Sequence, residues 1–357
     1  MANHEIGWVG TSRNGLDVEK EMEIRKRALE DLEVVEFLSN NSCCFFNRKE
    51  WLHILGEGFK VPVVIYCFEE DGKIRLVLPG MVFNFGIVKM FYSNIPYGGF
   101  VGEFELIPQW LTLLEKCLKR DGIGLLRIGR NFNNPFPDLN GFRWQAAYTH
   151  LLPLEGMTEE QLWNGYKKRV RRDVRKAEKS GIYIEEVGSS SEIDEMFHLY
   201  YQTMRRNIAY TTWTPRSLYS IYEHLVQTGK AKMLLAKKDG KQVAGIILLF
   251  SEDTVYYFFS ASSEKYFQYC PNDLLVHQAI CLAIREGKKY FDFMTSREDD
   301  TALMSFKEKW GAQKFPFHFF EKRLSLLRPW IWDQGWKIAN SRIGASLIRG
   351  IRGRSWG

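Results

Sequence analysis

The stretch Tyr290–Gln313, YFDFMTSREDDTALMSFKEKWGAQ, decides how this 357-residue chain is interpreted. Apolar and polar residues alternate around Asp292, which predicts a β-strand over the first five residues of the stretch. A polar segment follows, and then a short helix is expected. Phe306 and Trp310 lie four residues apart, so on a helix they share a face that packs into a core and holds Lys307 beside it. A fixed ammonium at the end of a strand is suited to stabilising a developing oxyanion, whereas an ordinary surface lysine is the simpler alternative.

Length and composition predict a globular protein of two domains. The chain is long enough for two hydrophobic cores, and its 45% hydrophobic and 26% charged residues are ordinary proportions. It shows neither a signal-peptide pattern nor a run of eighteen apolar residues, so no membrane-spanning helix is predicted. The six cysteines and seven histidines show no metal-ligand spacing. We therefore expect no metal site, no bound cofactor, reduced thiols and a cytoplasmic location, with the histidines at the surface or in packing.

The net charge of +6 is concentrated at the C-terminal end of the chain. Basic residues alternate with tryptophans in the tail 323–357, whereas the rest of the chain is nearly neutral. This composition predicts a helix that lies on an anionic membrane and attaches the protein peripherally to its inner face. Packing of the tail on the protein body is the alternative.

The order of predicted elements occurs twice along the chain: helix, hairpin, strand, loop, helix, strand. Asp71-Gly72-Lys73 and Asp239-Gly240-Lys241 mark the two hairpins. Chance agreement between common elements is the alternative to a true repeat. We divide the chain into a loose N-terminal segment 1–30, a first domain 31–154, a second domain 155–322 and the tail 323–357.

Several segments resemble, in order and spacing, the FemABX peptidyltransferases and their relatives in the GNAT superfamily. They are the stretch Tyr290–Gln313 and the segments LWNGYKKRVRRDVRKAEKSGI (162–182), AKMLLAKKDGKQVAGIILLF (231–250) and SASSEKYFQYCPNDLLVHQAI (260–280). The resemblance implies an α+β fold of two tandem GNAT-like domains, each a mixed sheet flanked by helices, with the first domain degenerate. It also implies transfer of an aminoacyl or acyl group to an amine, and the best-known members use aminoacyl-tRNA to build peptidoglycan cross-bridges.

Two carboxylates near Lys307 are candidate general bases for such a transfer. Asp292 lies on the predicted strand, and Glu308 follows Lys307 directly. A carboxylate needs a raised pKa to serve well in this role, so an acceptor amine that arrives neutral is the alternative. Phe306, which braces the lysine, is counted with the substrate-binding residues.

A second group of candidates would bind the acceptor. Arg206 and Tyr210 lie four residues apart near the end of a predicted helix, so both can point the same way. The pair resembles an arginine and a tyrosine with which the family holds its nucleotide-linked acceptor; a surface arginine and a packed tyrosine are the alternative. Tyr256 and Tyr257 follow each other on a strand, so one of them is expected to face the same cleft.

A basic helix is expected between Thr158 and Gly181. Its positive residues repel one another unless a phosphate-rich partner lies against them. We predict that tRNA is this partner and that Lys168, Arg171, Arg172 and Arg175 contact it. A solvated surface is the alternative.

The donor is predicted from the segment SEKYFQYCPND, over 263–273. GNAT proteins that use coenzyme A hold its pyrophosphate on a glycine-rich turn here, and this segment contains no glycine. The segment therefore favours aminoacyl-tRNA as donor, and the resemblance implies an amine-bearing cell-wall or envelope precursor as acceptor. Two alternatives stay open: an acyl-CoA-dependent N-acyltransferase acting on an amino sugar, lipid or polysaccharide, and a non-catalytic GNAT-like scaffold that binds membrane or RNA.

Overall fold

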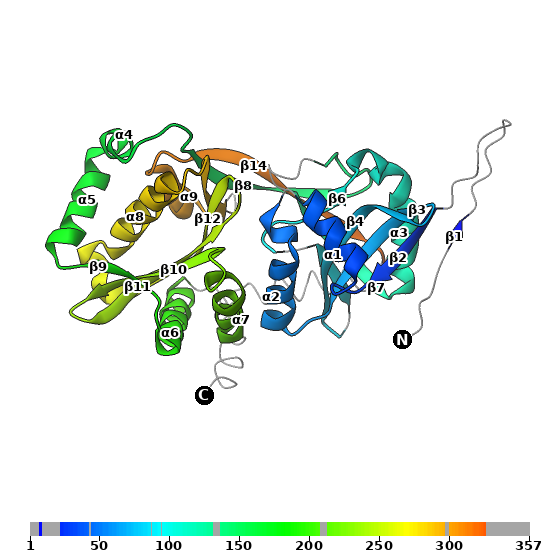
Figure 1. Ribbon diagram of the computed structural model, residues 1–357, viewed down its shortest axis with the longest axis horizontal. Coiled ribbons are helices and arrows are strands. Elements are labelled where there is room, and N and C mark those ends of the chain that lie inside the picture. Colours follow the sequence, from blue (N-terminus) through cyan, green and yellow to red (C-terminus); the bar gives the residue numbers. More distant parts are fainter. Residues whose placement is uncertain are drawn as a thin grey trace. The chain divides into compact units, whose positions relative to one another are not determined.

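The computed structural model describes residues 7–8, 22–42, 44–86, 88–93, 95–130, 136–207, 213–296 and 300–325 (Figure 1). These residues form two compact units. The first comprises the described residues up to Ala146 and those from Phe317 onward, and the second comprises Ala147–Pro316. No helix in the described part of the chain is both long and apolar enough to span a membrane. The predicted membrane-binding tail lies outside the described residues, apart from its first three positions.

The division into units differs from the boundaries expected from the sequence. The chain passes from one unit to the other within β8 (Arg143–Pro153), and it returns within β14 (Gln313–Arg323). Each unit therefore contains a strand segment that a cut at 154/155 would assign to the other domain. The predicted loose segment 1–30 also contains the ordered strand β2 (Met22–Arg27), which pairs with β3 (Val63–Glu70).

The polar composition of β2 explains why it was not predicted as a strand. Arg27 forms an ion pair of 2.8 Å with the buried carboxylate of Glu69 on β3. Ile24 is the buried apolar residue of β2, and Met22 packs at the edge of the same core. A charged strand of this kind is specified by its partner strand and not by its own hydrophobic pattern.

The first unit is a mixed sheet in the order β1-β2-β3-β4-β5-β7-β14. Only β5 and β7 are parallel. Its remaining strands are β1 (Gly7–Trp8), β4 (Lys73–Asn84), β5 (Lys89–Ser93), β7 (Ile123–Arg130) and β6 (Val101–Gly102), which pairs with β4. Its helices are α1 (Leu32–Asn41), α2 (Lys49–Phe59) and α3 (Ile107–Arg120), with short turns η1 (Phe45–Asn47) and η2 (Phe104–Leu106).

Alternation along β3 distributes the helices of this unit over two faces. Tyr66 and Phe68 pack with α3 residues in one core cluster, whereas Ile65 and Cys67 pack with residues of α1 and α2 in another. Successive strand residues point to opposite faces, so the sheet is covered on both sides.

The second unit repeats the layered arrangement, with its strands in the order β8-β13-β12-β11-β10-β9. These strands are β9 (Tyr183–Glu186), β10 (Ala231–Lys238), β11 (Lys241–Phe250), β12 (Thr254–Ser262) and β13 (Tyr290–Ser296). The helices are α4 (Glu159–Gly165), α5 (Lys168–Lys179), α6 (Ser190–Arg206), α7 (Pro215–Ile221), α8 (Pro271–Arg285) and α9 (Thr301–Glu308), with turns η3 (Tyr222–Val226) and η4 (Glu264–Tyr269). Figure 1 shows α5 and α8 on one face of this sheet and α6 on the other.

The two hairpins predicted from the sequence are present. Asp71-Gly72 connects β3 to β4, and Asp239-Gly240 connects β10 to β11. All four residues have positive φ, between 50° and 74°, as the two central residues of a type I′ hairpin turn require. The expected continuous basic helix is instead divided, because Tyr166 and Lys167 adopt extended backbone between α4 and α5.

The pairing of β12 with β13 positions the site. These parallel strands are paired at Thr254–Tyr256 and Tyr290–Asp292 only, although both continue beyond this point. On its other side β13 pairs with β8, and that register shifts between Asp292 and Thr295. The irregularity coincides with Met294, whose φ of 65° is rare for a residue with a side chain.

Gly102 offers a test of the close packing in the first unit. Its φ is 117°, and a Cβ atom there would lie 2.4 Å from the carbonyl oxygen of Arg75. We expect Gly102→Ala to lower the free energy of unfolding by more than about 2 kcal/mol, because backbone strain and steric overlap add. Gly72→Ala is the control, since a Cβ there meets nothing within 4 Å, and only a left-handed backbone cost of about 1–2 kcal/mol is expected. Equal effects of the two substitutions in urea unfolding would contradict the packing described.

Candidate active site

The ammonium of Lys307 lies inside the second unit. Lys307 extends from α9 and is 3% exposed, and its Nζ donates hydrogen bonds to the carbonyl oxygens of Met294 (2.8 Å) and Thr295 (2.9 Å). Burial lowers the pKa of Lys307 from 10.5 to about 7, while the carboxylates of Asp292 and Asp300 oppose this shift. Two of its three N–H groups are thus directed at the irregular end of β13.

The aromatic neighbours of Lys307 lie as the helical spacing predicts. Trp310 is buried in the core of the second unit, and Phe306 packs against the same core at its edge. The Nζ of Lys309 lies 4.7 Å from the ring centre of Phe306 and 5.1 Å from that of Trp310. The ring pair therefore anchors α9, while Lys307 leaves the helix in another direction.

Asp292 stabilises the backbone to which Lys307 is bound. Its Oδ1 accepts a hydrogen bond from the Thr149 hydroxyl (2.5 Å) and another from the Met294 N–H (2.7 Å), and the residue is completely buried. The Met294 contact fixes the strand irregularity described above. The predicted role of general base does not fit this position, because a carboxylate sealed from solvent and bound by two donors is poorly placed to accept a proton from a substrate.

His150 is a residue of the site that the sequence analysis assigned to surface or packing. It is completely buried on β8, and neither ring nitrogen has a hydrogen bond within the described residues. Its Nε2 lies 3.7 Å from Oε1 of Glu308, too far for a hydrogen bond. Burial, together with the charge of Lys307, lowers the pKa of His150 to about 4, so the imidazole is neutral at pH 7.

Glu308 is the accessible carboxylate of this group. Its side chain is 48% exposed, whereas Asp292 is completely buried. Of the two predicted general bases, Glu308 is therefore the one that a substrate amine could reach.

The tyrosines of β12 take different places. Tyr256 is paired in register with Asp292, so the two side chains point to the same face of the sheet. Tyr257 points to the opposite face and packs against Phe291 and Phe293, where burial raises its pKa to about 12. Tyr256 is thus the tyrosine on the side of Asp292, although it too is completely buried.

Arg206 lies at the end of β12. It extends from the last turn of α6, donates a hydrogen bond to the carbonyl oxygen of Ser262 (3.2 Å) and lies over the ring of Phe267 at 4.8 Å. These contacts hold a half-exposed guanidinium beside the loop that precedes α8. Its predicted partner, Tyr210, lies outside the described residues.

The residues predicted to bind RNA lie on α4–α5 but make contacts within the chain. Arg171 donates to the carbonyl oxygen of Asn164 (3.0 Å), Arg172 pairs with Asp173 (2.9 Å) and Arg175 lies over the ring of Trp163. Arg171 and Arg175 thus connect α5 to α4, whereas Arg172 pairs with its neighbour on the same helix and Lys168 is exposed.

The N-terminus of α8 has an acidic character that does not suit a pyrophosphate. Pro271 occupies its first position and lacks an N–H, and the preceding Cys270 has φ of 56°. Asp273 places a carboxylate in the first turn, where it pairs with the Nζ of Lys309 at 2.5 Å. At this helix end a coenzyme A pyrophosphate would lack one backbone N–H donor, and the carboxylate of Asp273 would repel it.

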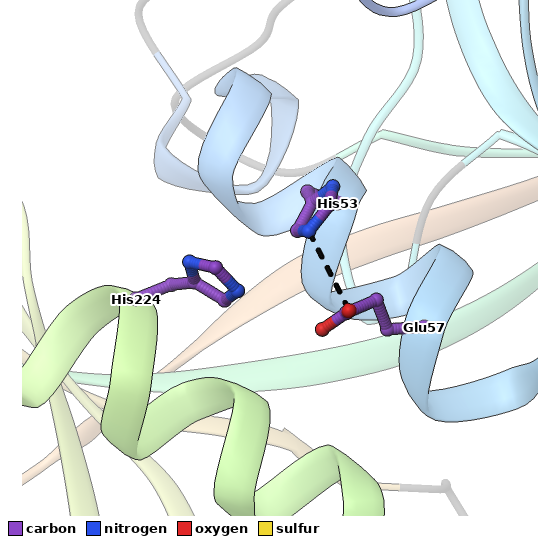
Figure 2. Close-up of side chains that lie close together, drawn as sticks. All are labelled: His53, Glu57 and His224. Carbon is purple, nitrogen blue, oxygen red and sulfur yellow. Dashed lines mark ion pairs between the residues drawn. The ribbon is translucent and has the colours of Figure 1, made fainter.

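The first unit has a cavity of about 320 Å³ lined by residues that include Glu30, His53 and Glu57. Figure 2 shows His53 and Glu57 one turn apart on α2. The His53 Nε2 and Glu57 Oε1 atoms form an ion pair of 3.7 Å when the imidazole is charged. An exposed helix pair of this kind contributes little stability, about 0.3–0.5 kcal/mol when charged. His224, also drawn there, belongs to η3 of the second unit.

Comparison with known proteins identifies the fold. The family model for the acetyltransferase (GNAT) domain matches residues 164–308, which include α5 to α9 of the second unit. Residues 164–308 are therefore similar to a GNAT domain. A search of curated protein sequences finds no match.

Solved structures extend the likeness over both units. FemX aligns with a TM-score of 0.64 and 16% identity, covering 85% of this chain and 98% of that chain. A tandem GNAT protein from the clavulanic acid biosynthesis pathway aligns with a TM-score of 0.56 and 11% identity, covering 86% and 99%. L-PGS from Bacillus licheniformis aligns with a TM-score of 0.55 and 14% identity, covering 92% and 98%. The expected α+β fold with tandem GNAT-like domains is therefore confirmed.

The depressed pKa of Lys307 predicts a pH dependence of stability. Between about pH 7 and 10.5 the unfolded chain binds the proton that the folded chain has released, so the free energy of unfolding rises with pH. We expect the free energy of unfolding of the unmodified chain, taken relative to that of Lys307→Met, to increase by up to about 1.4 kcal/mol per pH unit in this window. Urea unfolding at several pH values measures it, with Lys265→Met at an exposed position as control. A pH-independent difference would show that the buried amine keeps an ordinary pKa.

The hydroxyl of Thr149 can be removed with little change of shape. We expect Thr149→Val to lower the free energy of unfolding by about 1–3 kcal/mol, because Asp292 loses a donor inside the protein. Thr149→Ser keeps the hydroxyl and should retain most of the stability. If both variants unfold at the same denaturant concentration, the hydrogen bond to Asp292 contributes nothing measurable.

Proposed function

We propose that this chain is a FemAB-like transferase that moves an aminoacyl group from aminoacyl-tRNA to an amine of a cell-envelope precursor. The observation that carries the proposal is the buried Lys307 ammonium at the place where β12 and β13 part. The resemblance of the stretch Tyr290–Gln313 to the FemABX proteins, and the fold shared with FemX, support it.

In the proposed reaction the amine nitrogen of the acceptor attacks the ester carbonyl carbon of the donor. The C–N bond forms, and the carbonyl oxygen gains negative charge in the tetrahedral intermediate. The N–H of Lys307 that is not directed at Met294 or Thr295 donates to this oxygen, in a site from which water is largely excluded. The ester C–O bond then breaks, and the leaving ribose oxygen takes up the proton that the amine loses.

The proton must be carried between the amine and the leaving oxygen. Glu308 is the carboxylate accessible to a substrate, and the neutral His150 beside it offers a second group for hydrogen bonding. We assign the transfer to Glu308. Asp292 keeps a structural role, because it compensates the charge of Lys307 and fixes Met294.

The donor assignment rests on the N-terminus of α8. Pro271 removes a backbone N–H donor from this helix end, and Asp273 places a negative charge there, so a coenzyme A pyrophosphate is disfavoured. The basic surface of α5 is available to an RNA phosphate chain instead, and Arg206 beside the end of β12 would hold the anionic part of the acceptor.

A CoA-dependent N-acyltransferase acting on an amino sugar, lipid or polysaccharide is the second candidate, favoured by the match of residues 164–308 to the acetyltransferase domain model. A non-catalytic scaffold that binds membrane or RNA is a third. In either enzymatic case the protein would act in the cytoplasm, and the tail 323–357 would hold it peripherally at an anionic membrane near its acceptor.

Transfer assays distinguish these functions. Purified protein is offered labelled aminoacyl-tRNA or labelled acyl-CoA, each with amine acceptors, and label in the amide product is counted. We expect transfer from aminoacyl-tRNA only, and a fall of roughly 10²–10³-fold in kcat for Lys307→Ala, the loss typical of one oxyanion donor.

Lys265→Ala is the control for the loss of a lysine, and circular dichroism checks that each variant is folded. Transfer from acyl-CoA alone would establish the second candidate. Unchanged transfer by a folded Lys307→Ala protein would remove Lys307 from the mechanism, and no transfer from either donor would favour the scaffold.

A further inference from the structure

A cavity of about 430 Å³ lies on the surface of α9 that does not carry the Lys307 ammonium. Its lining residues come from the start of α5 and from α9: Lys167, Arg169, Val170, Ala302, Ser305, Phe306 and Lys309. The α9 residues recur at the spacing of one helix face, so the cavity is built on a regular element. Its volume falls within the range of about 300–1,000 Å³ that is usual for small-molecule sites.

The polar part of the lining is positively charged. Lys167, Arg169 and Lys309 contribute three cationic side chains, and no carboxylate is among the lining residues. Nearby acids compensate two of these charges in part: Arg169 Nε lies 3.6 Å from Asp173, and Lys309 pairs with Asp273. The cavity thus keeps an excess of positive charge, which favours an anionic ligand.

The first turn of α5 adds hydrogen-bond donors to these charges. The helix starts at Lys168, and the preceding Lys167 makes no capping hydrogen bond with its side chain. The first backbone N–H groups of a helix have no acceptor inside the helix, and they carry partial positive charge. The oxygens of a phosphate group can accept hydrogen bonds both from these backbone N–H groups and from the cationic side chains.

The remaining lining is apolar and includes an aromatic ring. Val170 and Ala302 contribute aliphatic surface, Phe306 contributes a ring and Ser305 contributes one hydroxyl. Inorganic phosphate or a sugar phosphate would leave this surface without a partner. A planar base joined to a phosphate matches both parts of the lining.

We propose that this cavity binds a nucleotide, with its phosphate at Lys167, Arg169 and Lys309 and its base against Phe306. A free nucleoside monophosphate and the terminal nucleotide of an RNA present this same chemistry. Phe306 lines the cavity and Lys307 does not, so a ligand bound here lies against a different face of α9 from the buried ammonium. The proposal does not depend on transfer by Lys307, because binding and transfer are measured separately.

The test titrates the whole protein with 5′-AMP, with adenosine and with a short single-stranded RNA that ends in CCA, by calorimetry at low and moderate salt. We expect AMP to bind at least roughly 10-fold more tightly than adenosine, and this preference to weaken with salt. Lys167→Ala and Arg169→Ala should each weaken AMP binding by roughly 5- to 10-fold. Lys179→Ala, an exposed lysine at the other end of α5, is the matched control and should leave AMP affinity unchanged.

Further comparisons complete the test. Phe306→Leu keeps an apolar side chain, and it should weaken AMP and RNA binding without affecting inorganic phosphate. RNA binding at least roughly 10-fold tighter than AMP identifies the RNA end as the natural ligand, whereas equal affinities identify the free nucleotide. Absence of AMP and RNA binding, equal affinities for AMP and adenosine, or unchanged binding in both α5 variants overturns the proposal. Nucleotide binding by unmodified protein that shows no transfer from either donor would show that the proposed reaction fails while the nucleotide site stands.

Discussion

A lysine ammonium enclosed by protein fixes the geometry of the second unit's candidate site. Removing such a charge from water is unfavourable, and the depressed pKa of Lys307 expresses that penalty. Two backbone carbonyls and the charge of Asp292 offset it in part. Those carbonyls belong to the segment of β13 that departs from regular pairing, so the strand irregularity and the buried charge depend on each other.

Helix α9 presents different residues to two different neighbours. One side sends Lys307 to β13, and the other lines the basic cavity with Phe306 and Lys309. Trp310 is buried in the core and holds the C-terminal end of the helix in place. A short helix with both sides engaged is poorly suited to large rearrangement, so a substrate must approach it in a conformation close to the one described.

The parts of the fold that depend on local sequence could be predicted. Strand alternation around Asp292, the spacing of Phe306 and Trp310, and the two Asp-Gly hairpins all lie within short windows. The contact of Thr149 with Asp292 joins residues 143 positions apart, and no local pattern reports it. His150 was missed for the same reason, although a polar Thr-His pair directly before the apolar Leu151-Leu152 of β8 was a usable signal.

Other predictions failed where a partner element decides the structure. Strand β2 is ordered by an ion pair with β3 and has no hydrophobic pattern of its own. The basic segment was expected to be continuous, yet a break before α5 exposes the helix start that now lines a cavity. The surroundings of Asp292 could not be predicted, because a sequence shows that a carboxylate is present but not that two donors already bind it.

The position of β8 limits how this fold can be divided into modules. The match to the GNAT domain model begins at residue 164, after the strand that supplies Thr149 and His150. A gene fragment with those bounds would encode Asp292 and Lys307 without the hydroxyl and imidazole that surround them. Recombination at this point would therefore separate Asp292 and Lys307 from Thr149 and His150. An exchange would keep these four residues together only if it included β8.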